Sequence, residues 1–203
     1  MPKQNLFAFL NWSAKVLVLL LVAVIAGVGF RYCLIQSNGN LRTVESGLVY
    51  RSAQLSEEEF TRQVKKLGIR SVINLRGENL GADWYGAEVK AAKNLDVTLI
   101  NYRMSAQVRL SVEQMKELVL VMKGAPKPVL IHCRAGADRT GLASALYCLE
   151  EGMTPSFMSL QLSRGLGHCT YLFSKSIAMD QSLAHYMQVK SAHPAAEEVG
   201  VSR

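Results

Sequence analysis

The chain has 203 residues, of which 49% are hydrophobic and 19% are charged. This composition supports a sizeable core and excludes a wholly disordered chain, while four cysteines are too few for a small fold built on disulfides. The formal net charge of +7 suits an anionic substrate or a membrane surface, and it is too small to indicate nucleic-acid binding.

An uncharged apolar run occupies residues 16–30, between Lys15 and Arg31. As a helix this run is about 22 Å long, which is shorter than the ~30 Å hydrocarbon core of a bilayer. Apolar residues at positions 6–10 lengthen it at the amino end, and the ammonium group of Lys15 can reach toward the membrane surface. We therefore expect residues 1–35 to form an N-terminal membrane segment, with residues 16–30 in the membrane.

The same run could belong to a cleaved signal peptide or to a buried core helix. A signal peptide ends at an A-x-A-like site, but the sequence at the end of the apolar stretch is GVGFRYC. This difference favours a retained single-pass anchor. The basic residues before the run, Lys3 and Lys15, and those after it, Arg31 and Arg42, are nearly balanced, and they slightly favour a domain on the extracytoplasmic side.

The remaining sequence predicts one domain, residues 44–190, after a polar linker at 36–43 and before a disordered tail at 191–203. Short apolar segments alternate with helical ones, which is typical of an α/β fold with a central, mostly parallel sheet of about four to five strands flanked by helices. Strands are expected at 48–51, 71–75, 97–100 and 128–132. Helices are expected at 56–68, 82–94, 111–124, 140–151, from 154 onward and at 171–188.

Capping residues mark the start of three of these helices. Ser56 with Glu59, and Ser111 with Gln114, have the spacing of a capping box, in which the hydroxyl accepts from the backbone N–H three residues later. Thr154 is followed by a proline at the first helical position, where the missing N–H costs nothing.

The segment HCRAGADRTG, residues 132–141, joins the most apolar strand to a helix. At such a junction the loop N–H groups and the positive end of the helix dipole converge on one point, which suits a phosphate group. The same field favours the thiolate of Cys133, and Arg139 can hold two phosphate oxygens. A nucleophile and an anion site therefore lie together, which predicts phosphoryl transfer to sulfur followed by hydrolysis.

This segment resembles the His-Cys-x5-Arg-Ser/Thr signature of the protein-tyrosine and dual-specificity phosphatase superfamily. The strings VYRSAQ and SVINLRGE are further similar to the opening strands of atypical dual-specificity phosphatases from bacteria, plants and fungi. The resemblance extends over about residues 44–170 and implies a dual-specificity phosphatase-like fold.

The resemblance implies a role for each residue of the loop. Cys133 would be the nucleophile, Arg139 would clamp the phosphate, and Thr140 would donate a hydrogen bond to the sulfur as it leaves. His132 would orient the loop through buried hydrogen bonds. The main-chain N–H groups that would bind the phosphate belong to Arg134, Ala135, Gly136, Ala137 and Asp138.

The sequence departs from the family in its general acid. These phosphatases carry an Asp on a loop 25–35 residues before the cysteine, but residues 101–111 contain no carboxylate, and Gln107 stands near the expected place. Asp96 precedes the strand and lies roughly 15 Å or more from the loop, since a strand rises ~3.3 Å per residue. Asp138 remains, at a position that is also acidic in myotubularin-type lipid phosphatases. Alternatively, the leaving group needs little protonation and Asp138 pairs with an arginine such as Arg134.

Other residues offer weaker indications. Arg76 follows a strand at the edge where α/β sheets bind ligands, and Arg103 and Arg109 lie on the acid-poor loop. Residues 164–168 could approach the site from a later turn, and Cys148 is expected in the core. Because no second ligand pair accompanies His132 and Cys133, we expect no metal and no cofactor.

The sequence thus predicts a membrane-anchored, cysteine-dependent phosphatase that acts on phosphotyrosine, phosphoserine or phosphothreonine. One alternative is a lipid or inositol-phosphate phosphatase with Asp138 as the acid. The other is a phosphate-binding module without turnover. The expected partners are a phosphorylated protein, an anionic phospholipid or a small phosphoester, and the membrane through residues 16–30, with no nucleic acid.

Overall fold

The computed structural model describes residues 3–37, 39–170 and 174–192. The chain divides into two compact units, Met1–Asn38 and Gly39–Arg203, each of which is described by itself.

The first unit is a single helix, α1 (Lys3–Ser37). Its stretch Trp12–Phe30 contains 19 residues with a mean hydropathy of 2.4. At 1.5 Å per residue this stretch is about 28 Å long, which matches the hydrocarbon thickness of a bilayer. The helix is therefore long and apolar enough to cross a membrane.

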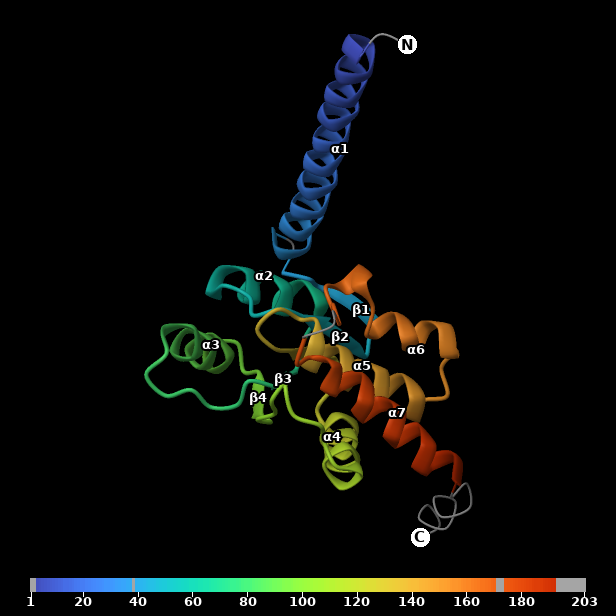
Figure 1. Cartoon of the computed structure of the whole chain (residues 1–203). Coiled ribbons are helices and arrows are strands. Elements are labelled where there is room, and N and C mark those ends of the chain that lie inside the picture. The colour runs from blue at the N-terminus through green and yellow to red at the C-terminus, as the bar shows by residue number, and fades with distance from the viewer. Residues whose placement is uncertain (1–2, 38, 171–173, 193–203) are drawn as a thin grey trace. The chain divides into compact units, whose positions relative to one another are not determined.

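The second unit is built on a five-stranded sheet with the strand order β1-β2-β5-β3-β4 (Figure 1). The four strands β2, β5, β3 and β4 are parallel, and β1 pairs with β2 in the antiparallel direction. This arrangement confirms the predicted fold class. The strands are β1 (Arg42–Glu45), β2 (Val49–Ser52), β3 (Ser71–Asn74), β4 (Thr98–Asn101) and β5 (Val129–His132).

Strand β1 was not expected from the sequence. Only Val44 of this strand is buried, so the segment RTVE lacks a hydrophobic pattern that could mark it. It forms because its main chain pairs with β2 at the edge of the sheet. As a result, Arg42 and Thr43 of the predicted linker are part of the sheet.

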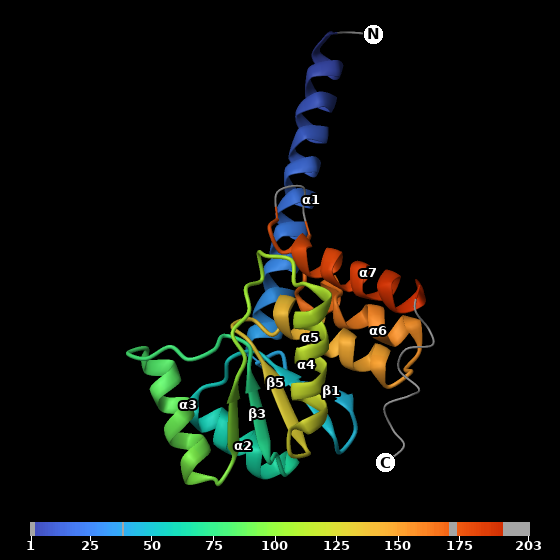
Figure 2. The same ribbon diagram turned by 90° about the horizontal axis from the view of Figure 1, so that it is seen from below.

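Helices cover both faces of the sheet (Figure 2). One layer contains α2 (Glu57–Leu67) and α3 (Asp83–Asn94), and the opposite layer contains α4, α5, α6 and α7. Strand residues alternate between them: Val72 and Leu130 pack with the first layer, and Ile73 and Ile131 pack with the second. The second layer and its short turn are α4 (Val112–Gly124), α5 (Asp138–Glu150), α6 (Pro155–Gln161), η1 (Arg164–Leu166) and α7 (Ile177–Ala192).

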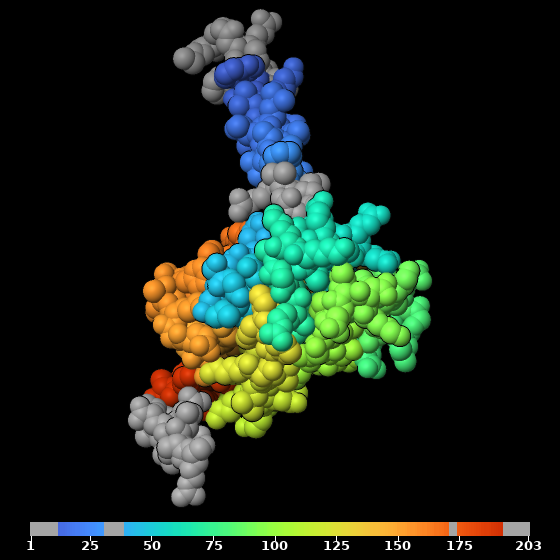
Figure 3. All heavy atoms as spheres, turned by 180° about the vertical axis from the view of Figure 1, so that it is seen from behind, coloured from blue at the N-terminus to red at the C-terminus, as the bar shows by residue number. Residues whose placement is uncertain are grey.

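Segments far apart in the sequence share one face of this unit. In the space-filling view from behind, the blue segment around β1 lies between the teal segment of α2 and the orange segment of α6 (Figure 3). Strand β1 thus lies at the edge of the sheet beside α6, which comes after the 132–141 segment in the sequence.

The predicted capping residues start their helices. The Ser56 hydroxyl accepts from the Glu59 N–H at 3.2 Å, and Ser111 and Gln114 form a complete capping box. Thr154 caps α6, which has its proline in the first turn. These ends follow from local chemistry, so they are predictable without knowledge of the fold.

Helix α7 begins later than predicted. The prediction was 171–188, but the helix runs from Ile177 to Ala192. Ser174 and Ser176 bond to each other through their hydroxyls at 2.6 Å, and the Ser174 hydroxyl also accepts from the Ser176 N–H. Such local hydrogen bonds compete with helix formation. Residues 171–173 and residues 193–203 of the predicted tail lie outside the described residues.

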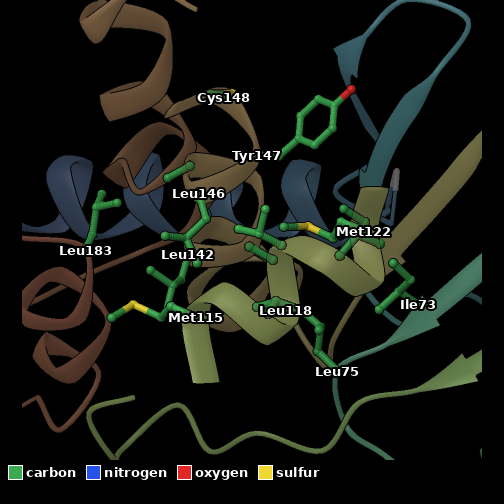
Figure 4. Close-up of a cluster of buried hydrophobic side chains, with 14 of the residues drawn as sticks. Ile73, Leu75, Met115, Leu118, Met122, Leu142, Leu146, Tyr147, Cys148 and Leu183 are labelled. Carbon is green, nitrogen blue, oxygen red and sulfur yellow. The ribbon is translucent and has the colours of Figure 1, made fainter. Parts of the chain in front are cut away.

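Helix α5 is at the centre of the larger hydrophobic cluster (Figure 4). All residues from Thr140 to Cys148 are buried, so the helix has no exposed face along this stretch. Leu142 and Leu146 belong to this cluster. Met115, Leu118 and Met122 of the neighbouring helix α4 point toward the same core. Cys148 lies in the core, as predicted.

We predict that Leu118→Ala lowers the free energy of unfolding by about 2–5 kcal/mol, because it leaves a cavity beside α5. Leu120→Ala is the matched control on the same helix, since Leu118 is fully buried and Leu120 is 69% exposed. The control should change stability by less than about 0.5 kcal/mol. Urea denaturation of the full chain in detergent measures both, and equal losses would contradict this packing.

Candidate active site

The segment 132–141 connects the central strand β5 to α5, as the sequence predicts. Cys133 directly follows β5 and is 2% exposed, and α5 begins five residues later at Asp138. The N-cap residue, Ala137, makes no side-chain capping bond, so no side chain at this position competes for the first N–H groups of the helix. Because the strands are parallel, the loop lies at the edge where their carboxyl ends meet.

Gly136 allows the loop to turn against the end of β2. Its φ is +65°, and a Cβ atom there would lie 2.5 Å from the Ala53 nitrogen and 2.6 Å from the Ser52 carbonyl carbon. Both neighbours are main-chain atoms, which cannot move aside cheaply. Glycine is therefore required here for its conformation and for its size.

A buried arginine holds the same turn. The Arg51 guanidinium donates to the Gly136 carbonyl at 2.6 Å, and to the main-chain and side-chain oxygens of Gln161 at 2.8 and 2.9 Å. Burial lowers the pKa of Arg51 to about 10, and a negative charge on Cys133 opposes this shift. Arg51 thus links β2, the loop and α6, and its cation lies within the electrostatic reach of the cysteine.

Asn40 supports the loop from the amino-terminal side. It is fully buried, and its side-chain amide donates to the carbonyls of Ala135, Gly136 and Leu166 at 3.2, 3.1 and 2.9 Å. Neither Asn40 nor Arg51 is among the predicted site residues. Arg51 could have been noticed because it is the one charged residue in the predicted strand 48–51. Asn40 could not, because an Asn is common in a polar turn.

Arg139 turns inward across the sheet edge. One of its terminal nitrogens lies 3.4 Å from the Leu75 carbonyl and 3.5 Å from the Met104 carbonyl, which follow β3 and β4. Its Nε is buried and has no hydrogen-bond partner in the described part of the chain. Its unpaired donor therefore remains available to an anion at the site.

Thr140 is fully buried beneath the loop. Its hydroxyl has no hydrogen-bond partner among residues 3–37, 39–170 and 174–192, so the structure does not contain the hydrogen bond to the Cys133 sulfur that the resemblance implies. A buried hydroxyl without a partner costs about 1–3 kcal/mol, so this donor is unsatisfied in the structure.

His132 has a buried acidic neighbour. Its Nε2 lies 2.8 Å from Glu88 Oε1, and both side chains are almost completely buried. Gln54 donates to the same carboxylate at 3.3 Å, while its own N–H donates to the Arg134 carbonyl at 3.2 Å. Glu88 of α3 was not identified from the sequence. Its contact with His132 is a close approach of charged groups, because neither ring nitrogen of His132 makes a hydrogen bond within the described residues, so the buried hydrogen bonds that the resemblance implies for His132 are not present.

Arg76 lies at the same edge and stacks on an aromatic ring. Its guanidinium carbon is 3.3 Å from the centroid of Trp84, and it donates to Gln54 Oε1 at 3.1 Å. Partial burial and then repulsion by Arg139 and Arg134 lower the pKa of Arg76. The positive charges of Arg134 and Arg139 thus act on Arg76, and such a concentration of positive charge favours an anionic ligand.

Asp138 pairs with a histidine and not with Arg134. Its Oδ1 lies 2.6 Å from His168 Nδ1, and His168 Nε2 lies 2.9 Å from Asp180 Oδ2 in the first turn of α7. Burial by itself would lower the pKa of His168, but its hydrogen bonds to the two carboxylates outweigh burial and raise it. Residues 164–168 thus reach the site through this histidine.

The acid-poor loop contributes no carboxylate. Gln107 and Arg109 are exposed, and the Arg103 guanidinium donates to the Glu78 carbonyl. Asp96 occupies the turn before β4, at the opposite end of that strand. Within the described ranges, no group of three or more His, Cys, Asp or Glu side chains is arranged to hold a metal.

Comparison with known families places much of the chain in one of them. The family described as the tyrosine phosphatase family matches residues 35–156, which include β1 to α5 and the whole 132–141 segment. No curated protein matches the chain.

Solved structures show the same fold at low identity. TpbA from P. aeruginosa is 20% identical, with 73% of this chain and 91% of that chain covered and a TM-score of 0.53. The core catalytic domain of the PP-IP phosphatase SIW14 from S. cerevisiae, solved with citrate, is 19% identical, with 76% and 93% covered and a TM-score of 0.55. Tk-PTP in its active form is 17% identical, with 71% and 97% covered and a TM-score of 0.52.

We predict that Gly136→Ala displaces the loop and weakens orthovanadate binding by at least about tenfold, or ~1.4 kcal/mol. Gly47→Ala is the matched control, because Gly47 also has a positive φ, +74°, but has open space around its Cα. Both variants place alanine at positive φ, which costs about 1–2 kcal/mol, and only the first also clashes with backbone. Calorimetric titration measures the affinities, and equal affinity in the two variants would contradict the tight approach.

Proposed function

The chain belongs to the tyrosine phosphatase family, and from this membership we propose that it hydrolyses phosphomonoesters of phosphorylated proteins through a phosphocysteine at Cys133. The observation that carries the proposal is the position of this cysteine at the end of β5 and in front of the first turn of α5. Arg139, six residues later, extends across the same edge of the sheet.

The proposed reaction has two steps. The Cys133 thiolate attacks phosphorus, a P–S bond forms, and the ester P–O bond breaks as the leaving oxygen takes a proton. Water then attacks phosphorus, the P–S bond breaks, and inorganic phosphate and the thiolate are released. Loop N–H groups from Arg134 to Ala137 and the Arg139 guanidinium would stabilise the charge on the phosphoryl oxygens in both steps.

Asp138 is the proposed general acid. Its carboxylate is next to Arg139 in the first turn of α5, and its side chain is 30% exposed, so a substrate oxygen can reach it. No residue between 101 and 111 carries a carboxylate that could act instead. Thr140 is proposed to stabilise the leaving sulfur in the second step through its unpartnered hydroxyl.

Phosphotyrosine, phosphoserine and phosphothreonine are the proposed substrates, as for enzymes of the dual-specificity type. A cysteine-to-serine variant of TpbA was solved in complex with phosphotyrosine. We further propose that α1 is a retained single-pass anchor and that the domain, residues 44–190, lies on the extracytoplasmic side with the tail 191–203. Anchoring would place the domain near phosphorylated membrane proteins or anionic phospholipids.

A polyphosphorylated substrate, such as a phosphoinositide or an inositol phosphate, is the second candidate. In its favour, Arg76 lies near Arg134 and Arg139, whose positive charges lower the pKa of Arg76, and together they carry more positive charge than one phosphate group requires. SIW14, which has the same fold, is named a PP-IP phosphatase. Arg76 is the proposed ligand of a second phosphate.

We predict that Cys133→Ser lowers the turnover of p-nitrophenyl phosphate by at least about 10³-fold, because a hydroxyl is a far weaker nucleophile than a thiolate. Cys169→Ser is the control, since Cys169 is also a free cysteine and has no role in the proposed reaction. Assays of the full chain in detergent, with and without orthovanadate, measure the effect. A wild-type chain that binds vanadate but hydrolyses no phosphoester would be a phosphate-binding module, and the proposal would fail.

For the second candidate, we predict that Arg76→Ala lowers kcat/KM for a phosphoinositide bisphosphate by about tenfold or more, the loss expected for one charge-assisted contact. The same variant should affect p-nitrophenyl phosphate much less. Arg109→Ala, at an exposed position on the 101–111 loop, serves as the control for loss of one positive charge. Equal losses on both substrates would assign Arg76 a structural role only.

A further inference from the structure

His168 is the buried link between the proposed acid and helix α7. The ring is 3% exposed, and each of its nitrogens faces a carboxylate oxygen, Asp138 Oδ1 at 2.6 Å and Asp180 Oδ2 at 2.9 Å. The two carboxylates come from different elements, since Asp138 opens α5 and Asp180 is in the first turn of α7.

While both Asp side chains are ionised, both contacts can form as hydrogen bonds only if the ring is protonated. A neutral imidazole has one N–H donor, whereas the imidazolium has two. The charged groups that act on the ring are Asp138 from α5 and Asp180 from α7, and the η1 turn that precedes it carries Arg164. Together the two carboxylates hold the pKa of His168 above its ordinary value despite burial.

We propose that His168 is a positioning residue for the general acid: its imidazolium, anchored by Asp180, holds Asp138 Oδ1 and directs Asp138 Oδ2 to the leaving group. This inference rests on the proposed function, because it assigns a role relative to Asp138 as the acid. No proton leaves His168 in the cycle, so the ring acts by hydrogen bonding and by charge.

The proton balance is simple. In the first step the Asp138 Oδ2–H bond breaks as the leaving oxygen gains that proton, and the resulting carboxylate is stabilised by the adjacent imidazolium. In the second step Asp138 Oδ2 takes a proton from the water that attacks phosphorus, which restores the acid. A deprotonated ring could donate to only one of the two carboxylates, and Asp138 would lose its fixed orientation whenever Asp180 kept the proton.

The coupling also has a stability consequence with a definite sign. Because the folded state raises the pKa of His168, the two hydrogen bonds stabilise the fold fully below the ordinary histidine pKa of about 6.5. This stabilisation is lost as the pH rises through the raised value. The difference in Tm between wild type and His168→Gln should therefore be largest in acid and should shrink in alkaline buffer.

The test compares the full chain with His168→Gln on two substrates. An alkyl phosphate requires protonation of its leaving group, whereas p-nitrophenyl phosphate does not. We expect kcat/KM for the alkyl phosphate to fall by about tenfold or more and kcat/KM for p-nitrophenyl phosphate to fall by less than about threefold, because kcat/KM reports loss of the leaving group and not the hydrolysis of the phosphocysteine that both substrates share. His185→Gln is the matched control, because His185 is an exposed histidine on α7.

Asp180→Asn provides the second readout. It keeps an oxygen near His168 Nε2 but removes one of the two charges that keep the ring protonated. The alkaline limb of the pH dependence of kcat for the alkyl phosphate should therefore move to lower pH. If His168 had a purely structural role, kcat would fall at every pH and the limb would stay in place. If His168→Gln does not fold, Asp180→Asn decides the question by this shift.

Four outcomes separate the possibilities. Equal losses on the two substrates in His168→Gln, or an unshifted limb in Asp180→Asn, would overturn the role of His168. Full activity of Asp138→Asn on both substrates would remove Asp138 as the acid, and the role of His168 with it, while Cys133→Ser still tests the phosphocysteine. A wild-type chain that hydrolyses neither substrate would overturn the proposed function itself.

Discussion

The hydrogen bonds from Arg51 and Asn40 to the loop carbonyls are the constraint on which the site depends. Both side chains are buried, and they donate hydrogen bonds to the carbonyls of Ala135 and Gly136. A loop whose carbonyls are occupied in this way can direct its N–H groups to a phosphate, because the two groups of a peptide unit point in opposite directions. Gly136 makes the arrangement possible, since no other residue fits against the end of β2.

Two buried histidine–carboxylate contacts flank this loop. His132 meets Glu88 of α3 before the cysteine, and His168 meets Asp138 at the start of α5. Helices α3 and α7, from opposite layers of the sheet, thus constrain the same loop from its two ends. The arginines at the open edge supply the positive charge, and the buried pairs determine the orientation of the groups that surround it.

Much of the fold and part of the site follow from local sequence. The central strand β5 is a buried apolar run, the capping residues define the starts of α2, α4 and α6, and the ten-residue segment that starts at the end of β5 identifies the loop and its cysteine. Strand β1 and the start of α7 were not predictable, because main-chain pairing forms the first and serine hydroxyl bonds delay the second.

The sequence by itself determined the identity and spacing of Cys133, Arg139 and Thr140, because residues in one short segment need only a strand-to-helix turn to come together. The tertiary structure alone decided the partners of the 132–141 segment: Asn40, Arg51, Glu88 and His168 lie on separate parts of the chain, between 30 and 96 residues away from the residues of this segment that they contact. Such contacts have no local pattern, since burial and pairing arise only when the helices pack on both faces of the sheet.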